Sequence, residues 1–401
     1  MIPRKEYLDF LTRSKDKQII KVISGIRRCG KSTLLELYRD RLLAEGVGES
    51  QLISINFEDM DYEELQDYHK LYRYIKERLL PDRMNYIFLD EIQHVPNFEK
   101  AVDSLFIRKN TDIYITGSNA YFMSGELATL LSGRYIELRM LPLSFAEYCI
   151  GNTENISYKD KYRRYIESSS FPYVLNYGGS EKEIRDYLSG IYNTVLLKDV
   201  VARYKISDIM MLESVVRFIF DNIGSRLSTT RIANTMTSDG RKIDQKTIEK
   251  YIKALLDSMM IYQAKRYNIK GRQYLKTLEK YYVVDIGLRY MLLGKRSTDV
   301  GHILENVVYL ELIRRGYDVY IGQVGDEEVD FVAMDSDGIK YFQVAASVRD
   351  EKTLERELSS LKKIRDNYPK YVLTLDDDPD ADYDGIRRIN AIDWLLKKAG
   401  Q

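Results

Sequence analysis

Short apolar runs alternate with amphipathic stretches between residues 18 and 150. Apolar runs of four to six residues, bounded by polar or turn residues, are typical of strands inside a sheet. Their alternation with helical stretches predicts an α/β domain around a largely parallel sheet. The strands that we expect cover residues 19–24, 52–56, 85–90, 112–116 and 135–138.

The apolar spacing changes to three and four residues between about residue 155 and residue 300, which predicts a mainly helical middle third. Within this part, three expected helices precede a strand-like stretch, and this order is that of a winged helix. The helices cover residues 212–223, 229–236 and 245–257, and the strand covers residues 261–267.

Apolar strands return after Gly301, with helices before and between them. We expect strands at residues 318–321, 328–334, 339–344 and 370–375. This pattern predicts a second, smaller α/β unit. The acidic stretch 376–384 is interpreted as a solvated loop.

Composition narrows the class of protein. A length of 401 residues predicts two or three compact domains. Lysine plus arginine equal aspartate plus glutamate, at 61 each, so overall charge indicates no partner. The two cysteines, Cys29 and Cys149, are typical of a reducing cytoplasm. No apolar run reaches 18 residues and the first residues lack the apolar core of a signal peptide, so we expect a cytoplasmic protein without a membrane partner.

Residues 25–33 match the phosphate-binding pattern GxxxxGK[ST], directly after an apolar strand and before a helical stretch. Glycines let backbone N–H groups and the helix N-terminus face phosphate oxygens, where the helix dipole favours negative charge. We expect Lys31 to reach the β and γ phosphates and Ser32 to hold Mg²⁺. The predicted site for ATP or ADP comprises Gly25, Arg27, Arg28, Cys29, Gly30, Lys31, Ser32 and Thr33.

A later apolar strand ends in two carboxylates, Asp90 and Glu91. Phosphoryl transfer needs one carboxylate near the metal and another to orient the attacking water, and we assign Asp90 to the first role and Glu91 to the second. The next strand ends in a polar tip that contains Ser118 and Asn119. Either side chain is placed to contact the γ phosphate or the water, and simple turn chemistry is the alternative.

Arginines supply further candidates. Charge that spreads over the γ-phosphoryl oxygens in the transition state is stabilised by an added arginine, and Arg134 is our candidate. A structural ion pair is the rival interpretation of Arg134. Arg27 and Arg28 are placed to contact either the nucleotide or neighbouring protein. Because Cys29 lies in the same loop, its alkylation is expected to block nucleotide binding.

Four motifs follow one another in a fixed order: Gly-Ile-Arg-Arg-Cys-Gly-Lys-Ser, Leu-Asp-Glu-Ile-Gln, Thr-Gly-Ser-Asn-Ala and Leu-Ser-Gly-Arg-Tyr. With these motifs, and with segments 280–287, 304–307 and 328–331, the chain resembles the prokaryotic AAA-type ATP-binding proteins that carry a C-terminal domain of unknown function. The resemblance extends over nearly the whole chain.

This resemblance implies four parts. They are an AAA+-like P-loop NTPase core at residues 1–150, a helical lid at 151–208, a winged helix at 209–300 and a domain similar to the PD-(D/E)XK (restriction-endonuclease-like) nucleases at 301–401. In the resembled ATPases the arginine finger comes from a neighbouring subunit. A homo-oligomer is therefore implied, with a hexameric ring as one candidate form.

Cations in the expected winged helix suggest contacts with the DNA backbone. Seven of them could neutralise phosphates in a salt-sensitive way that does not depend on sequence. They are Lys246, Lys250, Lys253, Lys265, Arg266, Lys270 and Arg272, with Tyr251 and Tyr267 interleaved. Winged helices also serve purely as protein contacts, and this alternative stays open.

The expected nuclease-like domain departs from the pattern of an active enzyme. The resembled nucleases need two acidic residues and then Glu-x-Lys, since two carboxylates hold Mg²⁺ and the lysine helps to activate water. Glu305 and Asp330 supply the first two, but Gln343 replaces the acid and Ala345 replaces the lysine. Lys340 could reach the site from another position. We expect a degenerate centre without nuclease activity.

We therefore interpret the chain as a Mg²⁺-dependent ATPase whose nucleotide state moves the winged helix and nuclease-like half, on DNA and as an oligomer. One alternative is a nucleotide switch with slow turnover that engages a protein partner. The other is an ATP-regulated nuclease, against which Ala345 argues.

Overall fold

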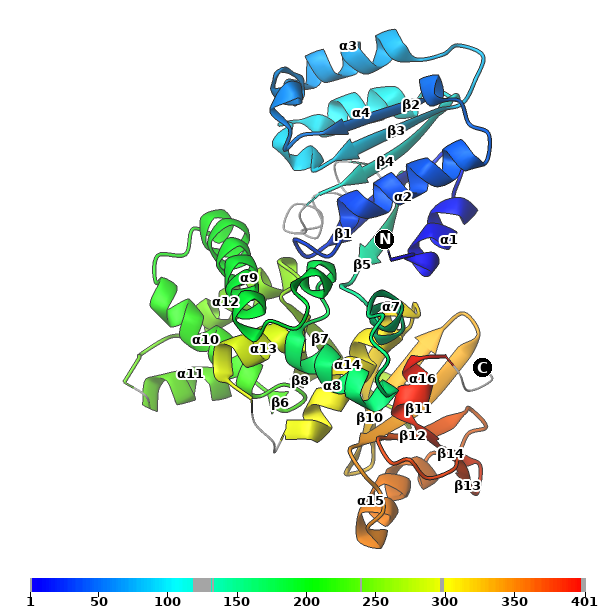
Figure 1. The fold of residues 1–401 in the computed structure, drawn as a ribbon. Helices are drawn as coiled ribbons and strands as arrows, with labels where there is room; N and C mark the ends of the chain where they lie inside the picture. The colour runs from blue at the N-terminus through cyan, green and yellow to red at the C-terminus, as the bar shows by residue number, and fades with distance from the viewer. Residues whose placement is uncertain (1, 118–130, 132, 239, 296–298, 398–401) are drawn as a thin grey trace. The chain divides into compact units, whose positions relative to one another are not determined.

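The computed structural model describes residues 2–117, 131, 133–238, 240–295 and 299–397. The chain forms two compact units (Figure 1). One comprises Met1–Pro142 together with Asp257–Met259, and the other comprises Leu143–Leu256 and Met260–Gln401. Ser118 and Asn119, two of the predicted site residues, lie outside the described residues.

A five-stranded sheet forms the centre of the N-terminal unit. Its strands are β1 (Ile20–Gly25), β2 (Leu52–Asn56), β3 (Asn85–Asp90), β4 (Thr111–Thr116) and β5 (Tyr135–Met140). They lie in the order β2-β3-β4-β1-β5, and every neighbouring pair is parallel. The predicted parallel α/β sheet is thus confirmed, with each strand within two residues of its expected bounds.

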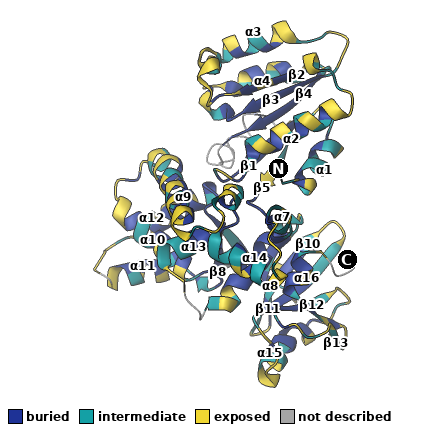
Figure 2. Cartoon of the chain, viewed as in Figure 1, coloured by how far each residue is buried: buried dark blue, intermediate teal, exposed yellow. Residues whose placement is uncertain are grey.

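Helices cover this sheet on both faces, as right-handed crossovers between parallel strands require (Figure 1). The helices are α1 (Lys5–Arg13), α2 (Lys31–Ala44), α3 (Tyr68–Arg78) and α4 (Phe98–Phe106), with short 3₁₀ turns η1 (Glu49–Gln51), η2 (Met60–Gln66) and η3 (Ile92–His94). α3 packs against α4, and α1 packs against α2. All residues of β1, β3 and β4 are buried, which accounts for their mainly apolar sequences (Figure 2).

The second unit begins with helices. They are α7 (Phe145–Gly151), α8 (Tyr158–Ser168), η4 (Pro172–Tyr177), α9 (Glu181–Thr194), the π-helical segment η5 (Val195–Ala202) and α10 (Ile209–Asp221). Ser144 caps α7, because its hydroxyl accepts from the Glu147 amide while the Glu147 carboxylate accepts from the Ser144 amide.

A three-helix and hairpin segment follows. α10 leads to β6 (Arg226–Leu227), α11 (Thr229–Ser238), α12 (Gln245–Asp257), β7 (Ile261–Asn268) and β8 (Gln273–Val283). β8 pairs antiparallel with both β6 and β7. The helices agree with the expected bounds to within three residues, whereas β6 and β8 were not predicted.

The remaining elements extend the hairpin into one nine-stranded sheet. They are α13 (Ile286–Leu293), α14 (Val300–Arg314), β9 (Asp318–Val324), β10 (Glu327–Asp335), β11 (Gly338–Ala345), α15 (Glu351–Lys362), β12 (Lys370–Thr374), β13 (Ala381–Tyr383), β14 (Ile386–Asn390) and α16 (Ala391–Leu395). The strand order is β13-β14-β12-β11-β10-β9-β7-β8-β6, and β7 pairs parallel with β9. The acidic stretch expected to be a loop thus contains the short edge strand β13.

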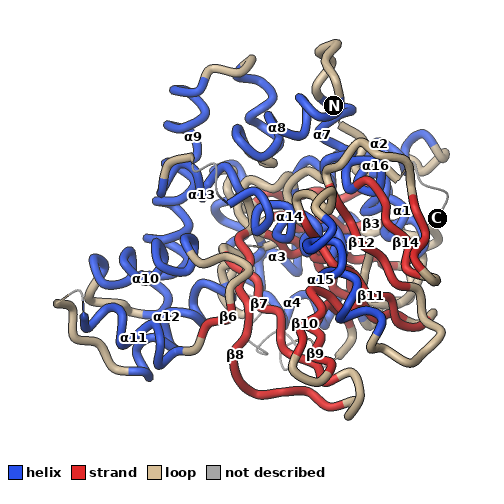
Figure 3. Tube along the Cα trace, turned by 90° about the horizontal axis from the view of Figure 1, so that it is seen from below, coloured by secondary structure: helices blue, strands red, loops and turns tan. Residues whose placement is uncertain are grey.

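Helices α14 and α15 both pack against β10 and β11, and Figure 3 shows them beside the strands of this sheet. The ring of Phe331 in β10 lies 5.8 Å from that of Tyr309 in α14. The next residue, Val332, belongs to a core cluster with Leu361 of α15. Successive residues of a strand point to opposite faces, so one strand serves both helices.

Asp285 explains the segment 280–287 that the sequence shares with the resembled family. It caps α13 by accepting from the Leu288 amide at 2.8 Å, and it accepts from the amide and hydroxyl of Ser170, both at 2.6 Å. A Cβ on Gly287 would lie 2.4 Å from the carbonyl oxygen of Ser168. Only glycine permits this approach of α13 to the end of α8.

Among the described helices, none has the length and apolar character needed to cross a bilayer.

Candidate nucleotide site and C-terminal acidic cluster

The predicted phosphate-binding loop connects β1 to α2. Lys31 is the first residue of α2, and Gly30 before it has a φ of 102°, which favours glycine. A Cβ on Gly25 would lie 2.5 Å from the carbonyl oxygen of Met140. The first turn of α2 contains no acidic residue, so no carboxylate there repels an anion from the positive end of the helix dipole. This turn has the backbone and charge of an anion site.

Arg4 supports the loop from the N-terminal segment. Its guanidinium, 4% exposed, donates to the carbonyl oxygen of Cys29 at 3.1 Å and to that of Leu141 at 2.7 Å. A third, longer hydrogen bond reaches the carbonyl oxygen of Pro142 at 3.4 Å. Arg4 therefore joins the loop to the chain just after β5. The sequence analysis did not select Arg4, because the residues next to it in the chain do not indicate that it is buried or that its partner lies 25 positions away.

Cys29 is buried beneath the loop. The residue is fully buried, and a Cβ on Gly25 would lie 2.8 Å from its sulfur. Burial raises the pKa of the thiol. A buried neutral thiol reacts slowly, so we expect alkylation of Cys29 to be slow, and its effect on nucleotide binding stays a prediction.

The other loop residues differ in exposure. Arg27 is partly buried and lies 3.7 Å from Glu58, measured between Nη1 and Oε1. Arg28 is exposed and has a φ of 67°. Ser32 is half-buried and Thr33 is exposed. Their roles toward nucleotide stay predictions.

The acidic pair converges with the loop lysine. The Nζ of Lys31 lies 3.5 Å from Oε1 of Glu91, and both side chains are buried. Glu91 has a φ of 54°, and this backbone turn at the end of β3 sets the direction of its side chain. The hydroxyl of Thr116, at the end of β4, accepts from the Glu91 amide at 2.9 Å and donates to the Asp90 carboxylate. Sequence reasoning assigned no role to Thr116, although a polar residue ending a buried strand is a visible signal.

The two carboxyls titrate differently. Burial raises the pKa of Asp90, and hydrogen bonds from Thr116 and Ser32 partly oppose this. Burial also acts to raise the pKa of Glu91, but the charge of Lys31 and a hydrogen bond from Gln93 outweigh it, so the pKa of Glu91 is lowered. Glu91 is therefore an anion at neutral pH, beside a cation and at the end of the central strands. The side chain of Ser32 forms a hydrogen bond with the Asp90 carboxylate. Mg²⁺ prefers oxygen ligands, and the Ser32 hydroxyl and the Asp90 carboxylate both supply them, so these two residues fit the metal.

Arg134 lies at the other end of the sheet from its own phosphate-binding loop. Its carbonyl oxygen accepts from the Ile20 amide at the start of β1, and β1 extends about 17 Å from there to the loop. Its guanidinium is 3.5 Å from Asp103 of α4 and lies over the ring of Phe106. Arg134 cannot contact a nucleotide bound by the same chain.

The predicted DNA-contacting cations do not form one group. Lys246, Lys250 and Lys253 are exposed on α12. Arg266 is 8% exposed and donates to the side chain of Gln323 in β9, so its predicted phosphate contact is corrected. The interleaved tyrosines, Tyr251 and Tyr267, are also buried, and both belong to the packing of the fold.

The hairpin turn that carries Lys270 and Arg272 is attached to the C-terminal strands. The amide of Ile269 donates to the carbonyl oxygen of Gln323 at 2.9 Å, and its side chain belongs to the core beneath α15. Lys265 is the remaining hairpin cation among those predicted to contact DNA, and it is exposed at an irregularity in β7. The hairpin thus belongs to the nine-stranded sheet, and its turn is bonded to β9.

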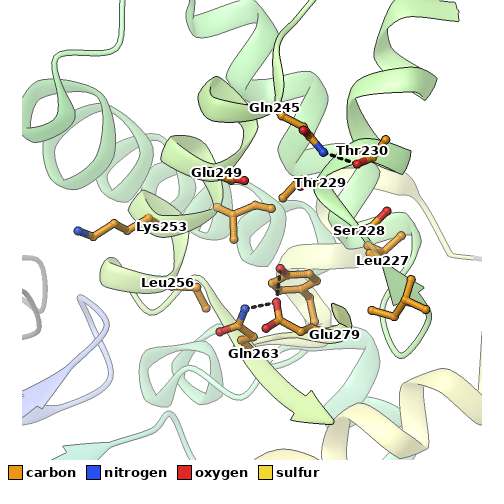
Figure 4. Close-up of a pocket in the computed structure, with 13 residues that line it drawn as sticks. Leu227, Ser228, Thr229, Thr230, Gln245, Glu249, Lys253, Leu256, Gln263 and Glu279 are labelled. Atoms are coloured by element: carbon orange, nitrogen blue, oxygen red, sulfur yellow. Dashed lines mark hydrogen bonds between the residues drawn. The ribbon is translucent and has the colours of Figure 1, made fainter. Parts of the chain in front are cut away.

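A pocket of about 490 Å³ lies between α12, the start of α11 and the hairpin (Figure 4). Its charged lining residues are Glu249, Lys253 and Glu279. Figure 4 shows the ammonium of Lys253 directed away from both carboxylates. Glu279 accepts from Gln263 and, at 3.3 Å, from the hydroxyl of Tyr281. The excess of carboxylates makes this pocket unsuited to a phosphate group.

The predicted nuclease-like residues meet around a lysine that the sequence analysis did not select. Lys280 of β8 places its Nζ 2.9 Å from Glu305 of α14, 2.8 Å from Glu328 and 3.8 Å from Asp330, both of β10. Lys340, by contrast, donates to the hydroxyl of Tyr317 at 2.8 Å. Gly224 approaches the Glu305 carboxylate so closely that a Cβ would lie 3.0 Å from its Oε2.

The third predicted ligand, Gln343, is occupied by other partners. Its Oε1 accepts from the Asp330 amide at 2.6 Å, and its Nε2 donates to Glu357 at 2.8 Å. Asp330 itself accepts from the Val344 amide at 2.9 Å. Among the described residues, no group of three histidine, cysteine or acidic side chains is arranged to hold a metal ion. The ammonium of Lys280 lies among the very oxygens that would coordinate Mg²⁺, so these residues do not fit the metal.

Comparisons with known proteins agree with the N-terminal geometry. A family model described as an AAA domain matches residues 17–149, and a model described as a domain of unknown function (DUF8612) matches residues 159–299. The first match spans the five parallel strands and the phosphate-binding loop. Residues 17–149 are therefore an AAA domain with a P-loop, which supports the AAA-type part of the predicted resemblance.

The full length of the chain also has relatives. An uncharacterized protein of Haemophilus influenzae is 40% identical over 99% of this chain and 99% of its own length, and this chain belongs to the same protein family. An uncharacterized protein of Methanocaldococcus jannaschii is 29% identical over 86% of this chain and 78% of its own length. Among solved structures, a Walker-type ATPase of Pyrococcus abyssi aligns with 73% of this chain and 96% of its own, at 17% identity and a TM-score of 0.48.

Proposed function

We propose that the chain is a Mg²⁺-dependent ATPase. The observation that carries the proposal is the convergence of three strand ends. Lys31 after β1 lies 3.5 Å from Glu91 after β3, and Thr116 at the end of β4 bonds to both members of the acidic pair. Phosphoryl transfer requires positioning and charge stabilisation rather than covalent chemistry by the protein, and this group supplies both.

Each residue has a distinct role in the proposed reaction. The N–H groups at the start of α2 and the ammonium of Lys31 bind the phosphates. Ser32 and Asp90 would hold Mg²⁺, which neutralises charge on the phosphate oxygens when bound. Glu91, kept anionic by Lys31, orients the attacking water. Thr116 fixes the direction of Asp90 through its hydroxyl.

The proposal includes an oligomer. Arg134 lies about 17 Å from its own loop, at the opposite end of β1, so a neighbouring subunit's loop is the one it can serve. An arginine supplied in trans would make assembly a condition for rapid turnover. The nearby Asp103 and Phe106 hold the guanidinium in this position.

DNA is the proposed partner of the C-terminal half. The element order α10-β6-α11-α12-β7-β8, with β8 between β6 and β7, supports assignment of a winged helix. Lys246, Lys250 and Lys253 are spaced by four and three residues and share one side of α12, where they suit successive phosphates. The order α14-β9-β10-β11-α15-β12 supports the likeness to PD-(D/E)XK nucleases as a fold without their activity.

Steady-state ATP hydrolysis with and without duplex, branched and single-stranded DNA tests the proposal. Lys31→Ala should abolish turnover, and Glu91→Gln should keep ATP binding while hydrolysis stops. Lys17→Ala, which removes an exposed lysine outside the loop, is the matched control. Hydrolysis by the Glu91→Gln protein at the wild-type rate would refute the assignment. Tight ATP binding with slow turnover that DNA does not stimulate would favour a nucleotide switch with a protein partner.

A further inference from the structure

The acidic cluster of the C-terminal half, formed by Glu305, Glu328 and Asp330, has a cation supplied by the chain itself. Lys280 is 4% exposed, and its Nζ lies within 3 Å of two of these carboxylates and 3.8 Å from the third. An ammonium has three N–H donors and no acceptor. Glu305 and Glu328 lie within hydrogen-bond distance of these donors, whereas Asp330, at 3.8 Å, lies just beyond it.

Other contacts fix the cluster in this arrangement. The hydroxyl of Tyr282, two residues along β8, donates to Oε1 of Glu305 at 2.7 Å, so Lys280 and Tyr282 hold the same oxygen. The guanidinium of Arg226 in β6 pairs with Oε2 of Glu328. Two cations thus face three acidic side chains, and the partners come from β6, β8, α14 and β10.

A divalent cation at this place would have to displace the ammonium. The displaced charge would then be buried without its partners, which costs several kcal/mol as an order of magnitude. The amide oxygen of Gln343, the remaining ligand that the sequence suggested, already accepts from the backbone of Asp330. Neither the space nor the oxygen atoms that a metal needs are accessible while Lys280 is in place.

We propose that Lys280 acts as a built-in counter-ion that occupies the acidic centre in place of a divalent metal and joins the hairpin to the C-terminal sheet. The centre is then a cation site that the chain itself fills. The three acidic side chains are not arranged to hold a metal ion while the ammonium is present, and its removal should let them shift together around one. This inference does not depend on the ATPase proposal.

Mn²⁺ binding to the full chain without nucleotide tests the inference. Wild-type protein should show no Mn²⁺ signal at this centre, so wild-type and Asp330→Asn proteins should give the same electron paramagnetic resonance titration. Lys280→Met keeps the length of the side chain but removes its charge. This variant should melt at a lower temperature, and Mn²⁺ at about one hundred times its Kd should raise the melting temperature by about 5 °C.

Two further variants complete the design. Lys280→Arg retains the charge and should not gain Mn²⁺ binding, whereas Lys280→Met combined with Asp330→Asn should lose the gain. If the Lys280→Met protein does not fold, the proposal is tested by comparing the Mn²⁺ titrations of the wild-type and Asp330→Asn proteins, which should be the same. Mn²⁺ bound by wild-type protein and lost in Asp330→Asn would overturn the proposal, as would metal-dependent DNA cutting by wild-type protein that Asp330→Asn abolishes.

Discussion

The guanidinium of Arg4 and the carbonyl oxygen of Cys29 are joined by a buried hydrogen bond of 3.1 Å in the N-terminal unit. The same guanidinium bonds the backbone at the end of β5. Two backbone segments that flank the predicted nucleotide site are thus held by one side chain. A hydrogen bond to a charged group contributes about 2 kcal/mol, so its loss should be measurable.

Arg4→Ala should lower both stability and nucleotide affinity, because the Cys29 carbonyl loses its donor and the loop loses its support. We expect about tenfold weaker ATP binding by calorimetry and a lower melting temperature. Arg13→Ala, in the exposed last turn of the same helix, is the matched control. Unchanged ATP affinity in a folded Arg4→Ala protein would exclude a positioning role.

Thr116→Val should slow hydrolysis while ATP binding is retained. Valine keeps the shape of threonine but cannot hold the Asp90 carboxylate or accept from the Glu91 amide. Loss of a side chain that hydrogen-bonds to a metal ligand typically lowers activity about 10-fold to 100-fold, and we expect a fall in kcat of that size. Thr116→Ser preserves the hydroxyl and should restore most of the rate. Equal rates in the Val and Ser variants would remove Thr116 from the site.

Arg134→Ala should reduce turnover by about 10³-fold if the finger acts on a neighbouring subunit. Mixing this protein with Lys31→Ala subunits should recover part of the rate, since each variant supplies what the other lacks. Arg83→Ala, at an exposed loop position, serves as the control for loss of an arginine. If mixed oligomers form and no activity returns, the pairing of Arg134 with Asp103 is only structural.

The double variant Lys246→Ala with Lys250→Ala should weaken DNA binding at every sequence tested. Because each neutralised phosphate contributes about 0.9 to the slope of log K against log salt, the slope should fall by about 2. Lys352→Ala with Lys362→Ala removes the same charge from exposed positions of α15. An equal loss of binding in both double variants would indicate a general charge effect rather than a contact by α12.

Local patterns were sufficient for the N-terminal sheet. The inner strands β1, β3 and β4 are buried on both faces, so each appears as a mainly apolar run. The phosphate-binding loop has a sequence that is specific to one kind of strand-to-helix connection. The same reasoning placed α12 at its observed bounds. These features depend on residues that are close together in the chain.

Contacts between distant residues were not accessible in this way. Lys280 and Glu305 are 25 positions apart, and nothing near either residue indicates that a strand of the expected winged helix supplies the cation. From the sequence, Arg266 could not be distinguished from the exposed cations near it, because its burial depends on the pairing of β7 with β9. The sequence shows which residues carry a positive charge, but it does not show whether their side chains face solvent or the interior.

The pairing of β7 with β9 has a consequence for how the chain can be divided. A fragment that ends near residue 295 would retain the hairpin but lose the strand that pairs with Arg266, Tyr267 and Asn268. Its unsatisfied backbone groups and the side chain of Ile269 would form an open edge, and such edges recruit other chains. The fragment should therefore aggregate on expression, and the last hundred residues are an obligatory folding partner of the segment before them.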